Sequence, residues 1–424
     1  MDVSKRTLGL GTETAFEVLA QVNKLKREGK DVISFCIGQP DFDTPRHIKE
    51  AAIRAINDGK TGYTDSAGLL SVRESVAKYL SRTRKIDVKP EHVVIANGAK
   101  PFIGFAVLCT TDFGSGDEVI YPNPGYPIYE SQIRANGAVP VALPLSEKKG
   151  FSFEIAELEK RITPKTKMLI LNYPHNPTGG MLTPEDLEAV AALAKKHDFW
   201  VYADEIYCQI VYEREFASIA SIPGMYERTI ISDGASKSYA MTGWRMGFAA
   251  NPVLAPHMAR WMTNMESCPN HMAQYAMKEA LDGPHDETRK MVASYRERRD
   301  LIVRLLNQIE GVTCLVPDGA FYVFPNVTKA VRNLGLADSD GLRRLLLQNG
   351  VAVLSDTHFG KRNPGDQEQH LRLSYVASKE DIVTGLARMK MVMEAGGVAV
   401  ENIAALSAKN AAAPITASAA TNKE

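Results

Sequence analysis

The sequence predicts an α/β fold with a large domain built on a mostly parallel β-sheet and a smaller α+β domain. Short apolar runs rich in β-branched residues alternate with amphipathic helical segments through most of the chain. This alternation is typical of a parallel sheet covered by helices on both faces. The 424 residues are enough for one large unit of this kind with a smaller one appended.

The predicted elements of the first 290 residues follow one another in a regular order. A helix over 12–28 ends at Gly29 and precedes a short strand over 32–38. From about residue 46 the alternation begins, and the strands we expect are 92–96, 118–122, 168–173, 199–203 and 229–232. Residues 184–197 form a helix between two of these strands, with acidic side chains in its first turn and lysines in its last, as the helix dipole favours.

A long charged helix over 286–310 leads into a second region with mixed element order. The strands expected there are 312–316, 320–325, 351–354 and 371–375. We therefore predict a large domain over 46–290 and a small domain made of residues 1–45 and 291–395. Residues 396–424 are rich in Ala, Ser, Thr and Asn, which cannot bury much surface, and we expect a disordered tail.

Composition limits the partners of this protein. Fifty basic and fifty acidic residues cancel, so neither nucleic acid nor a membrane surface is an expected partner. No apolar stretch is long enough to span a bilayer, and the first residues lack the apolar run of a signal peptide. Five scattered cysteines without CxxC spacing favour reduced thiols and a cytoplasmic location. The nine histidines lack metal-site spacing, so we expect no catalytic metal.

A polar segment directly follows each of the five strands predicted in the large domain. The segments are NGAKP (97–101), NPGYP (123–127), PHNPTGG (174–180), DEIY (204–207) and DGASK (233–237). Open parallel sheets bind their ligands at the carboxyl ends of the strands. We therefore expect these five segments to line a single site.

The side chains of these segments suit the parts of one cofactor. NGAKP opens a helix with free backbone N–H groups, which favours a phosphate. A buried Asp204 needs a cation as partner, and Tyr126 is suited to cover a flat ring. Lys237, confined near Arg245, would have a lowered pKa and form a Schiff base with a carbonyl. Arginine also binds phosphate in a bidentate manner.

Asn176 and Tyr207 supply hydrogen-bonding groups for a phenolic oxygen. Phosphate, flat ring, ring nitrogen, phenolic oxygen and aldehyde together describe pyridoxal 5′-phosphate (PLP). The same segments resemble the class I, fold type I PLP-dependent aminotransferases, most closely the aspartate aminotransferase-like branch. The resemblance covers residues 10–390 in order, and further matching stretches are IGQPDFDTP (37–45), GYTDSAG (62–68), SKSYAMTGWRMG (236–247), DGAFYVFP (318–325) and LRLSY (371–375).

The resemblance implies the catalytic roles. Lys237 would be the Schiff-base lysine and the proton shuttle. Asp204 would pair with the pyridinium nitrogen, while Tyr207 and Asn176 would contact the phenolic oxygen. Tyr126 would stack on the ring.

The resemblance also implies the residues that hold the phosphate. Arg245 and the backbone of Gly98 and Ala99 would bind it. Tyr63 would reach it from a second subunit, so we expect a homodimer. Many relatives carry a hydroxyl residue three positions before the lysine; here that position is Gly234, and Ser236 is an alternative contact.

The expected substrate contacts include two open questions. Arg372 would clamp the α-carboxylate, assisted by Asn176 and the Gly38 backbone. Lys100 belongs with the cofactor-binding set by position. In aspartate-specific relatives a lysine here can meet a distal carboxylate, but many relatives with a lysine there accept other substrates, so the substrate stays open. Asp356 and His358 lie near the expected substrate entrance, where a local turn hydrogen bond is the simpler role; Asp356 would repel a dicarboxylate if it faced the pocket.

These features predict an aminotransferase that moves an amino group from an L-amino acid to a 2-oxo acid. The reaction would be ping-pong, through the Lys237 Schiff base and pyridoxamine phosphate. A β- or γ-elimination or replacement enzyme, of C–S lyase or synthase type, stays open because the sequence does not fix which substrate bond lies perpendicular to the ring. A PLP-sensing regulator is disfavoured, since only about ten residues precede the first matching segment, too few for a DNA-binding module.

Overall fold

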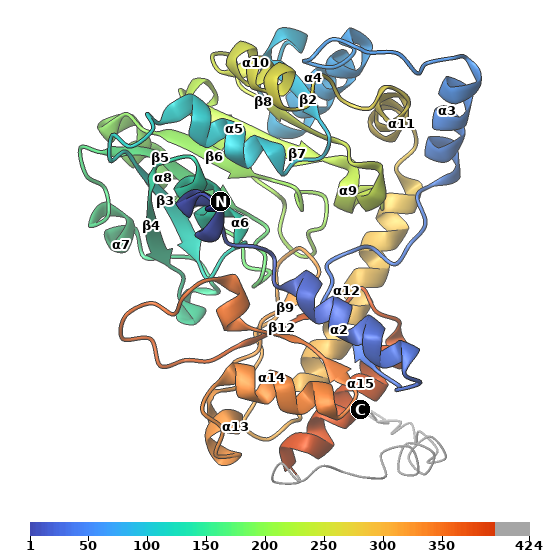
Figure 1. The fold of residues 1–424 in the computed structure, drawn as a ribbon, viewed down its shortest axis with the longest axis vertical. Coiled ribbons are helices and arrows are strands. Elements are labelled where there is room, and N and C mark those ends of the chain that lie inside the picture. Colours follow the sequence, from blue (N-terminus) through green and yellow to red (C-terminus); the bar gives the residue numbers. More distant parts are fainter. Residues whose placement is uncertain (395–424) are drawn as a thin grey trace, which may run out of the picture.

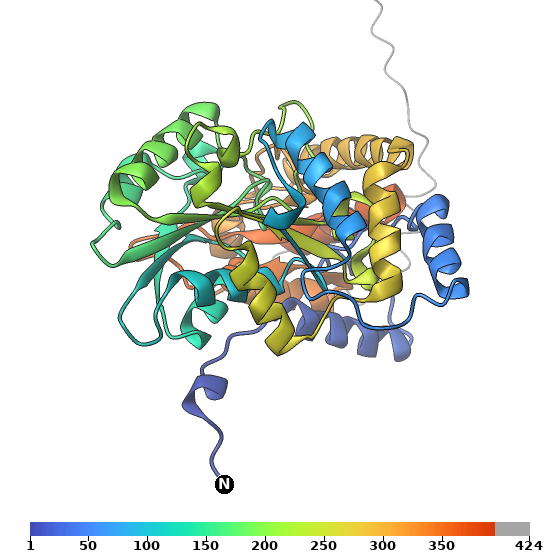
Figure 2. The same cartoon turned by 90° about the horizontal axis from the view of Figure 1, so that it is seen from above.

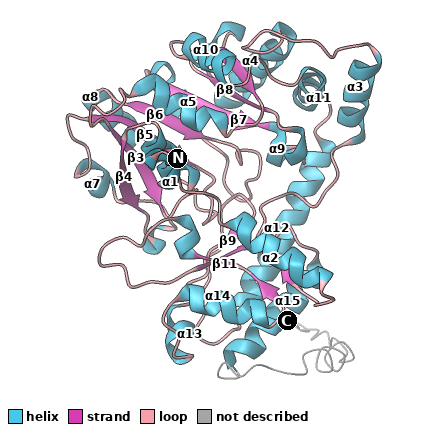
Figure 3. Cartoon of the chain, viewed as in Figure 1, coloured by secondary structure: helices cyan, strands magenta, loops and turns pink. Residues whose placement is uncertain are grey.

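A seven-stranded sheet forms the centre of the large domain in the computed structural model, which describes residues 1–394 (Figures 1 and 3). The predicted tail, 396–424, lies outside these described residues. The strand order is β2-β8-β7-β6-β5-β3-β4. The bounds are β2 (Val93–Ala96), β3 (Glu118–Asn123), β4 (Val139–Pro144), β5 (Thr166–Asn172), β6 (Trp200–Asp204), β7 (Thr229–Gly234) and β8 (Gly247–Ala250).

The sheet is parallel except for β8, which runs antiparallel to both of its neighbours, β2 and β7. Because two reversals restore the direction, the carboxyl end of β2 points to the same edge as those of β3, β5, β6 and β7. The five predicted strands are therefore confirmed, and their polar segments lie at one edge.

The sequence did not predict β4 or β8. Strand β4 reads VPVALP, and its two prolines are compatible with the sheet edge that it occupies. Strand β8 reads GFAA and has no β-branched residue. It is buried because it pairs with a strand on each side, and its composition alone does not predict a strand.

Helices cover both faces of the sheet because successive strand residues face opposite sides. One face packs on α5 (Pro101–Thr110), α6 (Ile128–Ala135) and α10 (Ala255–Met265). The other packs on α7 (Ile155–Glu159) and α8 (Pro184–His197) and, toward β2 and β8, on α3 (Arg46–Asn57), α4 (Leu70–Arg84) and α11 (His271–Asp282). Helix α8 begins with a capping box between Thr183 and Asp186.

The small domain lies below the sheet in Figure 1 and combines a segment near the beginning of the chain with the last third of the described residues (Figures 1 and 2). Strand β1 (Ile33–Ser34) pairs with β10 (Val351–Ala352), and β12 (Leu371–Ser374) lies between β9 (Tyr322–Val323) and β11 (Leu354–Ser355). Its helices are α2 (Ala15–Arg27), α12 (Asp286–Leu306), α13 (Thr328–Asn333), α14 (Ser339–Gln348) and α15 (Lys379–Glu394), and the short α1 (Lys5–Leu8) precedes α2.

The long predicted helix is confirmed as α12, which runs from the large domain into the small one (Figure 1). The strand predicted over 312–316 is wrong: Thr313 makes only an isolated bridge to Asn326, and Leu315 and Val316 are exposed. The domain limits at residues 45 and 290 stay a prediction. Across the described residues, no helix combines the length and apolarity needed to cross a membrane.

A buried ion cluster fastens α4 to the sheet behind the polar edge. The Arg84 guanidinium lies 2.8 Å from a carboxylate oxygen of Glu205 and 2.9 Å from one of Asp233. All three side chains are at most 4% exposed. Glu205 follows β6 and Asp233 lies near the end of β7, so Arg84 holds together the two strand ends that carry Asp204 and Lys237.

We expect Arg84→Met to lower the free energy of unfolding by about 3–5 kcal/mol, because two buried carboxylates would lose their cation. Urea unfolding of the cofactor-free protein measures this. Arg82→Met, at an exposed position of the same helix, is the control. Adding Glu205→Gln and Asp233→Asn should recover much of the loss, and a loss of Arg84→Met no larger than that of the control would contradict the assignment.

Candidate active site

A cavity of about 540 Å³ lies at the carboxyl edge of the sheet. All five predicted polar segments contribute side chains to its wall, and segments of the small domain complete it. The predicted site residues on this wall are Gly38, Ala99, Lys100, Tyr126, Asn176, Asp204, Tyr207, Ser236, Lys237, Arg245 and Arg372. Sequence order and strand direction thus bring most of the predicted set together.

Lys237 lies in the short helix α9 (Ala235–Ser238), which directly follows β7. Its Nζ donates a hydrogen bond to the Gly38 carbonyl at 2.6 Å and lies 6.0 Å from the centre of the Tyr207 ring. Burial lowers the pKa of Lys237 to about 8; the Glu13 carboxylate opposes this shift, and the nearby cations Arg372, Arg245 and Lys100 add to it. A larger fraction of this amine is therefore uncharged near neutral pH than for a free lysine.

Asp204 ends β6 and is buried. Its carboxylate accepts a hydrogen bond from the Tyr129 hydroxyl at 2.7 Å, and the Asn172 amide donates to its backbone carbonyl at 3.1 Å. Burial raises the pKa of Asp204 to about 6, although the Tyr129 hydrogen bond lowers it. A buried carboxylate of this kind is suited to a cationic partner.

Tyr129 and Asn172 were missed by the sequence analysis. Each stands next to a segment that was singled out: Tyr129 comes two residues after NPGYP, and Asn172 lies two residues before PHNPTGG. Their positions on α6 and at the end of β5 place them on the cavity wall.

Arg372 is held between the two domains. One guanidinium nitrogen donates to Asn176 Oδ1 at 3.1 Å and another to the Cys36 carbonyl. The guanidinium carbon lies 4.6 Å from the centre of the Tyr322 ring and 4.8 Å from that of Phe359. Its Nε is buried and has no hydrogen-bond partner among residues 1–394. A pre-positioned guanidinium of this kind is suited to bind a carboxylate.

Two glycines shape the end of the cavity around Arg245. Gly98 has a φ of +103°, and a Cβ there would lie 2.2 Å from an Arg245 Nη atom. A Cβ at Gly247 would lie 2.3 Å from the Ala99 backbone nitrogen. Both glycines therefore permit Arg245, Ala99 and the beginning of α5 to converge, and a guanidinium beside a helix start is a favourable anion site.

Comparisons with known proteins agree with this geometry. Residues 30–388 match the family model described as aminotransferase class I and II. The chain belongs to this family. It is 39% identical to a putative aminotransferase, YugH, of Bacillus subtilis over 85% of this chain and 91% of that protein. It is 35% identical to an aspartate aminotransferase of Bacillus subtilis, covering 93% of this chain and 99% of that protein.

The solved structure of an aspartate aminotransferase from Rhizobium meliloti superposes with a TM-score of 0.87 at 32% identity, over 93% of this chain and 99% of that one. The chain is a fold type I, PLP-dependent amino acid aminotransferase of the aspartate aminotransferase-like branch. The relatives' names support transamination over the elimination or replacement reactions that the sequence left open. The donor set of the cavity fits PLP: a confined amine, a buried carboxylate and an anion site.

Two predicted residues of this aminotransferase do not line the cavity of the single chain. Gly98 lies behind Arg245, as described above. Tyr63 is 91% exposed, on the segment between α3 and α4. That segment is held in place by Cys268, whose sulfur accepts from the Thr64 N–H, and by a hydrogen bond between His271 and the Gly62 carbonyl.

Asp356 does not face the cavity, so it cannot repel a dicarboxylate there. Its carboxylate binds Arg362 at 3.0 Å and the Ser339 hydroxyl at 2.5 Å. His358 lines the cavity, and its Nδ1 bonds to the Ser355 hydroxyl at 2.8 Å. Each therefore makes a local contact, but they do not bond to one another.

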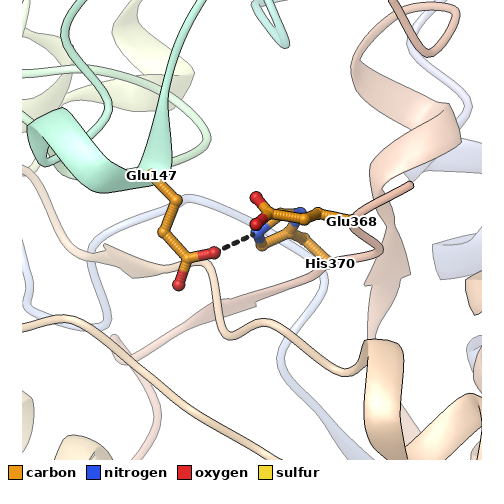
Figure 4. Close-up of side chains that lie close together, drawn as sticks. All are labelled: Glu147, Glu368 and His370. Atoms are coloured by element: carbon orange, nitrogen blue, oxygen red, sulfur yellow. Dashed lines mark hydrogen bonds and ion pairs between the residues drawn. The ribbon is translucent and has the colours of Figure 1, made fainter. Parts of the chain in front are cut away.

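A second polar cluster joins the two domains away from this cavity (Figure 4). His370, two residues before Arg372, lies 3.1 Å from a carboxylate oxygen of Glu147, and that same oxygen accepts a bond from Asn326 at 2.8 Å. Glu368 is close by but exposed. The bonds already made by Glu147 identify the cluster as an interdomain contact.

We expect Asp204→Asn to stabilise the cofactor-free protein at about pH 8, by up to about 3 kcal/mol. The folded-state pKa of about 6 exceeds the usual 3.8, so the ionised carboxylate destabilises the fold above that range. The gain should vanish below about pH 4, where the carboxyl is protonated in both the folded and the unfolded protein.

Urea unfolding of the cofactor-free protein at about pH 8 and below about pH 4 measures the change in the free energy of unfolding. Asp43→Asn, whose side chain is 97% exposed, is the control. An equal gain at both pH values would contradict the assignment. The same substitution should weaken PLP binding, so stability and cofactor affinity should change in opposite directions.

Proposed function

We propose that Lys237 is both the covalent anchor of PLP and the base of the transamination. The observation that carries this proposal is the confined Lys237 amine with its lowered pKa, between the cations of the cavity and the Gly38 carbonyl. A neutral amine is required both to attack an aldehyde and to accept a proton. The carbonyl of Gly38 gives the amine a fixed direction.

Bound PLP supplies an electrophilic aldehyde and an electron sink for negative charge at the substrate Cα. Asp204 would hold the proton on the ring nitrogen, and the Tyr129 hydroxyl would fix the orientation of that carboxylate. Tyr207 and Asn176 would hydrogen bond to the phenolic oxygen. Tyr126 would cover the ring from the segment that precedes α6.

Arg372 would bind the α-carboxylate of the amino acid and so fix the Cα hydrogen near Lys237. The Lys237 Nζ, freed by the incoming amine, would then take that proton and return it on the cofactor side. Hydrolysis by water would release the 2-oxo acid and leave the amino group on the cofactor, which completes the first half of the transfer. The Gly38 carbonyl would act on Lys237 rather than on the substrate, since it accepts the lysine hydrogen bond. Ser236, Arg245 and the backbone of Gly98 and Ala99 would hold the phosphate.

The protein would act as a homodimer, and it would work in the cytoplasm with L-amino acids and 2-oxo acids. Support for the dimer comes from the fixed but exposed position of Tyr63 and from the exposed Leu70 and Met265 on elements around that segment. The five cysteines are unpaired, which fits a reducing compartment.

We expect the rate of covalent PLP uptake by the cofactor-free protein to rise with pH and to level off above about 8, the pKa of Lys237, rather than near 10.5. The uncharged amine is the reactive form, and its fraction increases until that pH is passed. Borohydride reduction followed by mass spectrometry measures the uptake.

Lys237→Ala should abolish the covalent product and lower transamination by at least about 10³-fold. Lys196→Ala, at an exposed position of α8, should leave both unchanged. Covalent PLP at another lysine would refute the role of Lys237.

We expect the protein to sediment as a dimer, and Tyr63→Phe to weaken PLP retention about tenfold through loss of one hydrogen bond to a charged group. Hybrid dimers of Tyr63→Phe and Lys237→Ala subunits should regain one site with normal PLP affinity, because each site would take its tyrosine from the other chain. Retention that is the same in Tyr63→Phe and the unsubstituted protein would count against this arrangement.

A further inference from the structure

The charged side chains of the cavity wall can be assigned one by one under the proposed function. Among the described residues the wall carries Lys100, Lys237, Arg245, Arg372, Glu13 and Asp204, besides His358. Lys237 and Arg245 serve the cofactor, Asp204 serves its ring nitrogen, and Arg372 serves the α-carboxylate. Lys100 and Glu13 are the pair with no role in that scheme.

Glu13 and Lys100 neutralise one another. The same carboxylate oxygen of Glu13 pairs with the Lys100 ammonium and accepts a hydrogen bond from the Tyr126 hydroxyl. The Glu13 side chain is 17% exposed, and that of Lys100 is 47% exposed. Burial and the Glu13 carboxylate raise the pKa of Tyr126, so its hydroxyl keeps the proton that it donates.

Contacts on both sides of Glu13 hold it at the cavity. Before it, the Ser131 hydroxyl of α6 donates to the Gly11 carbonyl at 3.0 Å, and the Arg6 guanidinium lies 4.6 Å from the centre of the Phe113 ring. After it, Val18 and Val22 of α2 are buried in the small domain against residues that include Phe359. Glu13 therefore belongs to the segment between α1 and α2, which runs from the large domain to the small one (Figures 1 and 2).

Several further residues of the cavity wall are apolar, alongside polar ones such as Thr14 and Gln39. Ala15 and Phe16 follow Glu13 in the chain, and Ile37, Ile103 and Phe359 come from other segments of the same wall. Apolar surfaces of this kind favour an uncharged side chain, because burying a second carboxylate there requires a cation that Glu13 already occupies.

We propose that Glu13 is a specificity-determining residue that neutralises Lys100, so that the substrate side-chain subsite takes amino acids with uncharged, apolar side chains in preference to aspartate and glutamate. This inference rests on the proposed function of the same cavity. A distal carboxylate must displace Glu13 from Lys100 or lie beside it, and like charges placed together weaken binding strongly. The chain thereby differs in its preferred donor from relatives named for aspartate.

The test compares the PLP-loaded enzyme and its Glu13→Gln variant with leucine, phenylalanine and aspartate as amino donors. The unsubstituted enzyme should have the higher kcat/KM for leucine or phenylalanine. Glu13→Gln should raise kcat/KM for aspartate relative to leucine by about tenfold, which corresponds to ~1.4 kcal/mol. Glutamine can still accept the Tyr126 hydrogen bond. The Glu13 charge also raises the pKa of Lys237, but that effect acts on both donors alike, so the ratio of the two kcat/KM values reports the subsite.

Two further variants separate the charge effect from a structural one. Glu17→Gln, exposed in the first turn of α2, removes a charge from the same region and should leave the ratio unchanged. Glu13→Gln combined with Lys100→Gln should lose the gain in aspartate activity, because the freed cation is then absent.

An equilibrium measurement provides a readout independent of turnover. The two probes are maleate, a dicarboxylate, and 3-phenylpropionate, a monocarboxylate with an apolar ring. Calorimetric titration of the PLP-loaded enzyme should show that 3-phenylpropionate binds more tightly than maleate. Glu13→Gln should tighten maleate binding about tenfold without a matching change for 3-phenylpropionate.

The outcomes distinguish this inference from the proposed function. A preference for aspartate in the unsubstituted enzyme, or an unchanged ratio in Glu13→Gln, would overturn the inference while leaving transamination through Lys237 intact. Absence of covalent PLP at Lys237 would overturn the proposed function, and the relative binding of the two carboxylates would still report on Glu13.

Discussion

The site depends on the hydrogen-bond ladder that aligns the ends of β5, β6 and β7. Asn172 pairs with Asp204, and Asp204 pairs with Ser232, so three strand ends form one row across the sheet. A shift of one residue in β6 would turn Asp204 to the opposite face. The ladder, rather than any single side chain, therefore sets where the carboxylate lies relative to the lysine that follows β7.

The cavity concentrates charges that burial disfavours, and the surrounding structure compensates for each of them. Burial raises the pKa of Asp204 and lowers that of Lys237, so both groups are shifted toward their uncharged forms before any ligand binds. Behind them, Arg84 pairs with both Glu205 and Asp233 and offsets part of their negative charge. A cationic ring nitrogen beside Asp204 and an anionic phosphate beside Arg245 would then balance the charges of the cavity itself.

Much of this arrangement could be predicted from the sequence. The five apolar runs predicted the strands, and the polar segments after them predicted which residues lie at one edge of the sheet. Both patterns can be recognised in short stretches of the sequence. What could not be predicted depends on partners distant in sequence. Strand β8 is buried only through pairing with β2 and β7. Tyr129 and Asn172 acquire roles only once α6, β5 and β6 are packed together, and Glu13 once its segment lies against Lys100 and Tyr126. The direction of the Asp356 side chain, toward Arg362 and Ser339, was not predicted either.

The antiparallel strand β8 has a further consequence for the site. Gly234 at the end of β7 is paired with Gly247 at the beginning of β8, so the chain between them forms a closed loop that carries both Lys237 and Arg245. The proposed covalent anchor and the proposed phosphate ligand are thus spaced by one hairpin of fixed length. An insertion or deletion within residues 235–246 would change the distance between the two attachment points of the cofactor, whereas the loops that follow the parallel strands can vary in length without altering it.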